Sequence, residues 1–312
     1  MMQFGLIGIG AGAAAALLFA SVTSGVWLSI PLFYLAPLPI MIAGLGWSHW
    51  SAFIAALVGA SALGLLFGPV LFFTFLAAAG APAWWLSYLA MLARPVGNDA
   101  ATLEWYPSGS LVLWAALLGA LVVIVAIPNF GLDAESFRSG LRQSVVQTLG
   151  ADSAMPANTD RLIDFLVAAI PPGAALVATI ITLVNLWLAG IVVKFSGRLN
   201  RPWPALADMT FPRPVIAGLA VAVALSFAGG LVSIVAGVVS ASLLMAYGVL
   251  GLAVLHAITR GMASRVFLLT AVYVAVLLLG WPTLLLCLLG LLDAVVDLRA
   301  RIGATRGPSA LT

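Results

Sequence analysis

Long uncharged apolar runs follow one another along this sequence, and they decide the class of fold. About 20 mostly apolar residues form a helix long enough to cross the hydrocarbon core of a bilayer. Charges, prolines and turn residues divide the chain into about ten such runs, within a range of eight to ten. The predicted spans are residues 4–21, 26–46, 49–67, 69–92, 110–127, 172–193, 214–230, 235–257, 266–280 and 282–297.

A water-soluble fold is excluded, because only 7% of the 312 residues are charged, against roughly 25% in an average soluble domain. A bundle in lipid needs polar groups mainly at its two ends. We therefore predict an all-α fold, a polytopic transmembrane helical bundle that makes residues 1–312 a single integral membrane domain. Pro31, Pro37 and Pro39 in the second span, and Pro282 at the start of the last, allow broken or re-entrant segments.

The thirteen basic residues indicate the orientation, because cytoplasmic loops retain Lys and Arg. With ten spans and the N-terminus inside, ten of the thirteen face the cytoplasm: Arg94, Lys194, Arg198, Arg201, Arg213, Arg260, Arg265, Arg299, Arg301 and Arg306. The other three, Arg138, Arg142 and Arg161, lie in the net acidic segment 129–171, which is assigned outside. We expect a multi-pass protein of the bacterial inner (cytoplasmic) membrane with both termini in the cytoplasm.

Segment 129–171 is too short for an independent core, and its pattern predicts external amphipathic helices. One helix face carries apolar residues at a spacing of four: Phe137, Leu141, Val145 and Leu149. Gly150 would end this helix, and Asn158 or Thr159 would cap a second short helix that Pro171 and Pro172 break. The segment is either an interfacial hairpin packed on the bundle or a lid over a substrate site.

Enzymatic and metal-binding motifs are lacking. The single cysteine, Cys287, excludes a disulfide framework and a cysteine metal site, and two histidines far apart in the sequence argue against a histidine cage. The sequence contains no HExxH, Walker or GxSxG motif. The basic residues are scattered and form no stripe that would bind nucleic acid. We expect no enzyme activity, no cofactor and no nucleic-acid partner.

Polar residues within the apolar runs are the candidate functional residues, because such groups are costly in lipid. Asp293, Asp297 and Arg301 are spaced by four, which places them on one helix face. Asp293 is either a coupling or gating charge that faces a cavity or a group that bonds to a neighbouring helix. Asn185 and His256 are further candidates; Asn185 would hydrogen-bond a facing helix or touch a ligand, and His256 would be interfacial or carry a proton.

Small residues in the first span predict close helix packing. Gly8 and Gly12 form a GxxxG pair, and Ala11 and Ala15 form an AxxxA pair on the same helix. Pairs of this kind let two helix backbones approach closely in lipid.

Several motifs of the C-terminal half carry a family resemblance. They are Lys194-Phe195-Ser196-Gly197-Arg198-Leu199 after Asn185, Phe211-Pro212-Arg213-Pro214, Gly290-Leu291-Leu292-Asp293 and Asp297-Leu298-Arg299. On these motifs the chain is similar, over nearly its whole length, to the YybS-like predicted membrane proteins (domain of unknown function 2232), a bacterial family of unknown function.

The N-terminal part resembles two other families in the rhythm of its residues: Ala36-Pro37-Leu38-Pro39, Gly44, Gly46 and Arg94-Pro95. It is similar to the substrate-binding membrane subunits of energy-coupling-factor vitamin transporters and to the rod-shape membrane protein MreD. The resemblance implies a small-molecule carrier or a membrane scaffold. In the transporter family an AxxxA pair on an early helix docks onto the energising subunit, and Ala11 with Ala15 matches that pair. The additional spans and segment 129–171 depart from the six-helix pattern of that family.

Two functions follow as hypotheses. The leading one is a small-molecule transport-associated, substrate-binding membrane subunit without an energising domain of its own. The alternative is a non-transporting cell-envelope or cell-division scaffold. The partners implied are the lipid bilayer and either other membrane subunits or an energising ATPase module.

Overall fold

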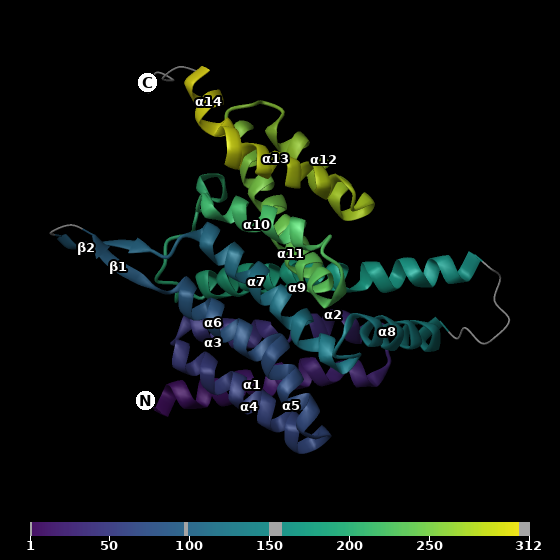
Figure 1. Ribbon diagram of the computed structural model, residues 1–312. Coiled ribbons are helices and arrows are strands. Elements are labelled where there is room, and N and C mark those ends of the chain that lie inside the picture. Colours follow the sequence, from purple (N-terminus) through teal and green to yellow (C-terminus); the bar gives the residue numbers. More distant parts are fainter. Residues whose placement is uncertain (1, 97–98, 150–157, 306–312) are drawn as a thin grey trace. The chain divides into compact units, whose positions relative to one another are not determined.

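Helices make up nearly all of the described chain, as a polytopic bundle requires. The computed structural model describes residues 2–96, 99–149 and 158–305 (Figure 1). Within this part, seven helical stretches are long and apolar enough to cross a membrane: Gln3–Ser24, Ser29–Gly46, His49–Phe67, Pro69–Ala90, Ser108–Asn129, Asp160–Phe195 and Gly230–Ile258. Three shorter apolar helices are Pro214–Leu225, Arg265–Leu279 and Pro282–Val296. The all-α membrane bundle is confirmed; that the three shorter helices also cross the bilayer stays a prediction.

The chain divides into two compact units. Unit 1 comprises Met1–Pro107 and Ala178–Trp203, and unit 2 comprises Ser108–Val177 and Pro204–Thr312. Unit 1 contains helices α1 (Met2–Ala20), α2 (Ser29–Tyr34), α3 (Pro37–Gly46), α4 (His49–Phe67), α5 (Pro69–Phe75), α6 (Ala81–Ala90) and the second half of α9 (Asn158–Phe195). Unit 2 contains α7 (Ser108–Ala126), α8 (Ala134–Leu149), the first half of α9, α10 (Pro214–Leu225), α11 (Gly230–Ile258), α12 (Arg265–Leu279), α13 (Pro282–Val296) and α14 (Leu298–Thr305).

Close approach of α1 and α4 organises unit 1. Gly8 and Gly12 of α1 face α4, and a Cβ added at Gly12 would lie 2.6 Å from the carbonyl oxygen of Ala55. Ala15 of α1 is fully buried and Ala11 is half-buried. The candidate small residues of the first span therefore lie at or beside a contact within unit 1.

A glycine pair also brings the two central helices of unit 2 together. Helix α11 packs along α13 and also contacts α7. Gly251 of α11 and Gly290 of α13 lie at the crossing, where a Cβ on either residue would collide with the backbone of the facing helix. The absence of a side chain at both positions permits this contact.

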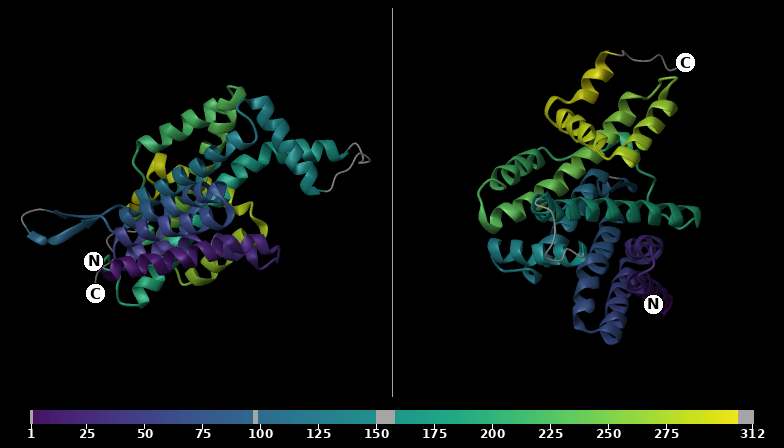
Figure 2. Two further views of the ribbon diagram at one scale, coloured as in Figure 1. Left: turned by 90° about the horizontal axis from the view of Figure 1, so that it is seen from below. Right: turned by 90° about the vertical axis from the view of Figure 1, so that its right-hand side faces the viewer.

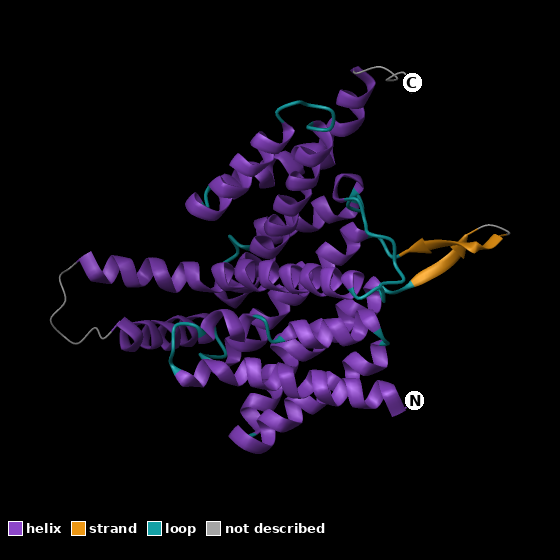
Figure 3. Cartoon of the chain, turned by 180° about the vertical axis from the view of Figure 1, so that it is seen from behind, coloured by secondary structure: helices purple, strands orange, loops and turns teal. Residues whose placement is uncertain are grey.

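A β-hairpin, which the sequence did not predict, follows α6 in unit 1. Strands β1 (Ala93–Val96) and β2 (Asp99–Trp105) pair antiparallel, and they are the orange arrows of Figure 3. Arg94 lies opposite Glu104 in the register, and their side chains form an exposed ion pair at 2.6 Å. The hairpin was missed because its strands lack the alternation of apolar and polar residues that marks a half-buried strand.

The predicted break at Pro171 and Pro172 is wrong, because α9 continues through both prolines from Asn158 to Phe195. A proline inside a helix removes one hydrogen bond, and neighbouring helices can hold such a helix together in spite of that loss. The first half of α9 lies antiparallel to α8 (Figure 2), and Arg142 of α8 forms ion pairs with Asp160 and Asp164 of α9.

Helix α8 follows the predicted amphipathic pattern except at its end. Phe137, Leu141 and Val145 are buried, whereas Leu149 is exposed, because it is the last residue of the helix. Phe137 and Leu141 form an apolar cluster with Ile127, against which residues of α9 and α11 pack. Gly150, predicted to end this helix, lies outside the described residues, as do the side chains of Asn158 and Thr159.

Candidate functional site

A break in the second predicted span is the first unusual feature of unit 1. Helix α2 ends at Tyr34 and α3 begins at Pro37. The N–H of Leu38 bonds to the carbonyl of Leu35, where a continuous helix would bond it to the carbonyl of Tyr34. Prolines therefore produce the break that was expected, and the carbonyl of Tyr34 is left for another donor.

Asn185 of α9 supplies that donor. Its Nδ2 atom donates to the carbonyl of Tyr34 at 2.9 Å and to the carbonyl of Ile181 in its own helix at 2.8 Å. The residue is only 1% exposed, and its Oδ1 atom has no hydrogen-bond partner among the described residues. Asn185 thus joins α9 to the break between α2 and α3 and keeps one buried acceptor unused.

A second irregularity lies in the fourth predicted span. Helices α5 and α6 are joined by a short π-helical turn, Leu76–Gly80, followed at once by Pro82. The turn packs against α4, and a Cβ added at Gly80 would lie 3.2 Å from the Cβ of Ala56. π-Helical turns inside α-helices are frequent at functional sites. Here the turn and Pro82 interrupt the regular hydrogen bonding of a predicted span.

A small polar cavity of about 260 Å³ lies at one end of unit 1. It is lined by the turn between α3 and α4, the end of α6 and the loop after α9, including Trp47, His49, Tyr88 and Asn200. The rings of His49 and Tyr88 are 5.3 Å apart, and the Arg198 guanidinium lies 4.7 Å from the centre of the Trp47 ring. His49 is therefore a cavity residue as well as the first residue of α4.

Arg201 ties the loops together at this end of unit 1. Its guanidinium donates to the carbonyl of Ala90 at 2.9 Å and to the carbonyl of Tyr106 at 2.8 Å. Burial lowers the pKa of Arg201 below its ordinary value, because the charged form loses water. The two carbonyls replace part of that hydration.

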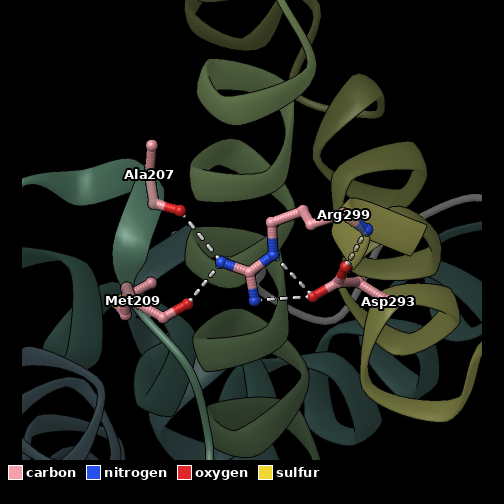
Figure 4. Close-up of polar contacts among 4 residues, drawn as sticks. All are labelled: Ala207, Met209, Asp293 and Arg299. Carbon is pink, nitrogen blue, oxygen red and sulfur yellow. Dashed lines mark hydrogen bonds and ion pairs between the residues drawn. The ribbon is translucent and has the colours of Figure 1, made fainter. Parts of the chain in front are cut away.

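In unit 2 the candidate charge Asp293 forms a buried ion pair with Arg299. The Nε and Nη2 atoms of Arg299 donate to Oδ2 of Asp293 at 3.0 and 2.7 Å (Figure 4). The side chains of Asp293 and Arg299 are 3% and 17% exposed. Nη1 of Arg299 also donates to the carbonyls of Ala207 and Met209, at 3.0 and 2.8 Å. The pair therefore fastens the end of α13 to the loop before α10.

The predicted face that joins Asp293, Asp297 and Arg301 is interrupted at Asp297, before it reaches Arg301. Helix α13 ends at Val296, and Asp297 has a left-handed backbone with φ of 53°, so the helical spacing stops there. Arg301 instead donates from Nε to the carbonyl of Val296 at 2.9 Å. At this break the charged partner of Asp293 is Arg299.

Arg299 is the site residue that the sequence reasoning did not single out. It lies six residues after Asp293, a separation that places two residues on different faces of a continuous helix. Only the change of chain direction at Asp297 brings Asp293 and Arg299 together. An Asp residue by itself predicts a left-handed backbone only weakly, so this turn is hard to foresee from the sequence.

His256 and Arg260 lie near the end of α11. Nε2 of His256 is 3.0 Å from the hydroxyl of Tyr273 on α12, and Arg260 forms an exposed ion pair with Asp208 at 3.2 Å. His256 therefore links two helices of unit 2, α11 and α12. In the part of the chain that the structure describes, no group of three or more His, Cys, Asp or Glu side chains could hold a metal ion.

Comparison with known proteins identifies the family. A search of curated proteins and a search of solved structures gave no match. A family model described as predicted membrane protein (DUF2232) matches residues 13–294. The YybS-like resemblance of the C-terminal motifs is consistent with this match, whereas the likenesses to energy-coupling-factor subunits and to MreD stay predictions. Since the matched residues cover most of the chain, the protein belongs to the DUF2232 family of predicted membrane proteins.

Proposed function

We propose that the protein is a transport-associated membrane subunit that binds a small polar molecule in unit 1. The unpartnered Oδ1 of Asn185 at the break between α2 and α3 carries this proposal. A buried acceptor without a hydrogen bond costs about 1–3 kcal/mol, and a purely structural link to Tyr34 would need only the Nδ2 donor. Discontinuous membrane helices are typical of substrate sites in transporters.

The polar cavity at the end of unit 1, which Asn185 does not line, is a second feature that suits a small polar ligand. Its volume of about 260 Å³ lies just below the range of about 300–1,000 Å³ that is usual for ligand pockets, which suits a small ligand. Aromatic side chains and polar groups line it together, among them Trp47, His49, Tyr88 and Ser48.

We further propose that the loops rich in basic residues lie in the cytoplasm and that both termini are cytoplasmic. In unit 1, Arg201 binds carbonyls at the end of α6 and before α7. In unit 2, Arg299 and Arg260 bind the loop 204–213, through its carbonyls and through Asp208. Basic side chains therefore bind loops at one end of each unit. Because cytoplasmic loops retain Lys and Arg, these ends are the ones we assign to the cytoplasm.

Energy for transport would come from a partner, because the sequence lacks a nucleotide-binding motif. The partner would be an energising ATPase module or another membrane subunit, and the protein itself would have no catalytic activity. Ala15 is fully buried, so the pair Ala11 and Ala15 does not present the free docking surface that the transporter resemblance implies. Docking would use another surface.

Native mass spectrometry of gently extracted protein tests the binding function. We expect a co-purifying small molecule in the unaltered protein and its loss in Asn185→Leu. The matched control is Ser240→Ala, which removes another buried and unpartnered polar atom, in unit 2. Repeated absence of a small molecule from folded protein would contradict the proposal, and stable envelope or division partners in a pull-down would then favour the scaffold.

A further inference from the structure

A cavity of about 870 Å³ opens between the α8–α9 hairpin and the ends of α10 and α11 in unit 2; we name it the hairpin cavity. Its wall combines apolar side chains of α8, α9 and α11 with four charged residues: Glu135, Arg138, Arg142 and Asp164. The proposed binding function of unit 1 does not involve this cavity.

Two of the four charges are already paired and two are not. Arg142 forms ion pairs with Asp160 and Asp164 across the hairpin. Glu135 and Arg138, three residues apart on α8, take part in no ion pair among the described residues. The cavity thus offers one free anion and one free cation, which is the complement of a zwitterion.

The tandem prolines of α9 lie in the same wall. Pro171 and Pro172 have no N–H, so the carbonyls of Val167 and Ala168 lack the donor that a regular helix supplies four residues on. All four of these residues line the hairpin cavity. A ligand with N–H donors could satisfy the two carbonyls that the prolines leave open.

The position of the cavity along α9 indicates an amphiphile. Asp164 is the last charged residue before a stretch, 165–193, that contains no charge and would span about 44 Å as a helix. This length exceeds the roughly 30 Å core of a bilayer, so the cavity lies where α9 passes from the apolar core to the polar hairpin. Phospholipid headgroups occupy that depth.

We propose that the hairpin cavity binds a zwitterionic phospholipid whose headgroup carries a primary ammonium group. The phosphate lies at Arg138. The ammonium lies at Glu135 and donates to the carbonyls of Val167 and Ala168. The acyl chains leave along the apolar wall. A quaternary ammonium headgroup has the same charge but no N–H, and a glycerol headgroup lacks the cation, so both bind more weakly.

Native mass spectrometry from nanodiscs tests this assignment. The discs contain equal amounts of phosphatidylethanolamine, phosphatidylcholine and phosphatidylglycerol with identical acyl chains. We expect one phosphatidylethanolamine to be retained in about tenfold preference over phosphatidylcholine, as two ordinary hydrogen bonds would produce. Equal retention of phosphatidylcholine or of phosphatidylglycerol would overturn the proposal.

Two sets of variants separate the contributions of charge and of the open carbonyls. Arg138→Gln should lower phosphatidylethanolamine retention. Arg161 is an exposed arginine of the same hairpin that lies outside the cavity, so Arg161→Gln should not lower it.

The double variant Pro171→Ala, Pro172→Ala restores both N–H donors inside α9. This double variant should stay folded and lose the preference for phosphatidylethanolamine over phosphatidylcholine. The control is Pro214→Ala at the start of α10, where the proline leaves no helical carbonyl without its donor; this variant should keep the preference.

A competition experiment distinguishes a bound lipid from a bound free headgroup. Free phosphoethanolamine at millimolar concentration should not displace the retained lipid, because it lacks the acyl chains that the apolar wall holds. Displacement by the free headgroup would show that the site takes a soluble zwitterion and would overturn the proposal. An unchanged preference in the double proline variant would overturn the role of the carbonyls of Val167 and Ala168 and the proposal with it.

Discussion

Arg299 surrounds the carboxylate of Asp293 with three donors, although a helix break separates the two residues. The backbone N–H of Arg299 donates to Oδ1 at 3.1 Å, and its guanidinium donates twice to Oδ2. The same guanidinium binds two carbonyls of the loop before α10. The contact therefore joins three segments of unit 2 through one buried charge pair.

Removal of one charge from this pair should destabilise unit 2. Asp293→Asn leaves the buried guanidinium of Arg299 without a counter-charge, and we expect the free energy of unfolding to fall by about 3 kcal/mol. Asp208→Asn is the matched control, because its ion pair with Arg260 is exposed and should contribute at most about 1 kcal/mol. Unfolding in detergent micelles measures both. Equal stability of Asp293→Asn and the unaltered protein would show that the pair is not structural.

The double variant Asp293→Asn, Arg299→Gln distinguishes a pair from two independent effects. If the two charges act on each other, the double variant should lose less stability than the sum of the two single variants, with a coupling energy above about 1 kcal/mol. Strict additivity would contradict the pairing. If a phenotype of gene deletion is known and Asp293→Asn remains fully active, Asp293 is a structural residue only.

Glycines of α1 should tolerate substitution according to their contacts. Gly12→Ala places a methyl group against the carbonyl of Ala55, so we expect a loss of about 1–3 kcal/mol in stability. Gly5→Ala lies on the same helix with nothing within 4 Å of the added Cβ, and it should be neutral or slightly stabilising. Thermal unfolding compares the two variants. Equal melting temperatures would show that α1 does not pack on α4 as described.

Topology can be tested by labelling single cysteines. In a Cys287→Ala background, Ser139→Cys on α8 should react only from outside, and Ser196→Cys after α9 only from inside. The reason is that α9 carries an uncharged stretch, 165–193, long enough to cross the bilayer between them. A membrane-impermeant maleimide, applied to intact cells and to inverted vesicles, measures the accessibility. Reaction of both cysteines from the same side would refute the crossing.

Asp133 should make the start of α8 sensitive to acid. The backbone N–H of Ser136, its hydroxyl and the N–H of Glu135 all bond to the Asp133 carboxylate, and they lower the pKa of Asp133 below its ordinary value of 3.8. A lowered folded-state pKa stabilises the folded helix above pH 3.8, and this contribution is lost as the pH falls through the folded-state value.

Amide hydrogen exchange measures this effect at the first turn of α8. Exchange at Glu135 and Ser136, corrected for the intrinsic pH dependence, should become faster below about pH 3.8 in the unaltered protein. Asp133→Asn keeps a capping side chain but cannot titrate, so its corrected exchange should not change over the same interval. A pH dependence in Asp133→Asn equal to that of the unaltered protein would contradict the role of this carboxylate.

Local chemistry explains which structural expectations the sequence could support. Runs of uncharged apolar residues predict helices because a backbone in lipid must satisfy its own hydrogen bonds. The prolines after Tyr34 predicted the break between α2 and α3, since proline has no N–H. The same rule failed at Pro171 and Pro172, where α9 continues, because the rule says which bonds are lost and not whether neighbouring helices hold the segment.

The sequence by itself determined the class of this protein, a helical membrane bundle, and the approximate position of its helices. Tertiary structure alone decided the partners of the polar groups. Asn185 reaches a carbonyl 151 residues away, and Asp293 pairs with Arg299 across the helix break at Asp297. Helical periodicity relates only residues within a turn or two of one another, whereas these contacts depend on where a chain breaks and which segments then meet.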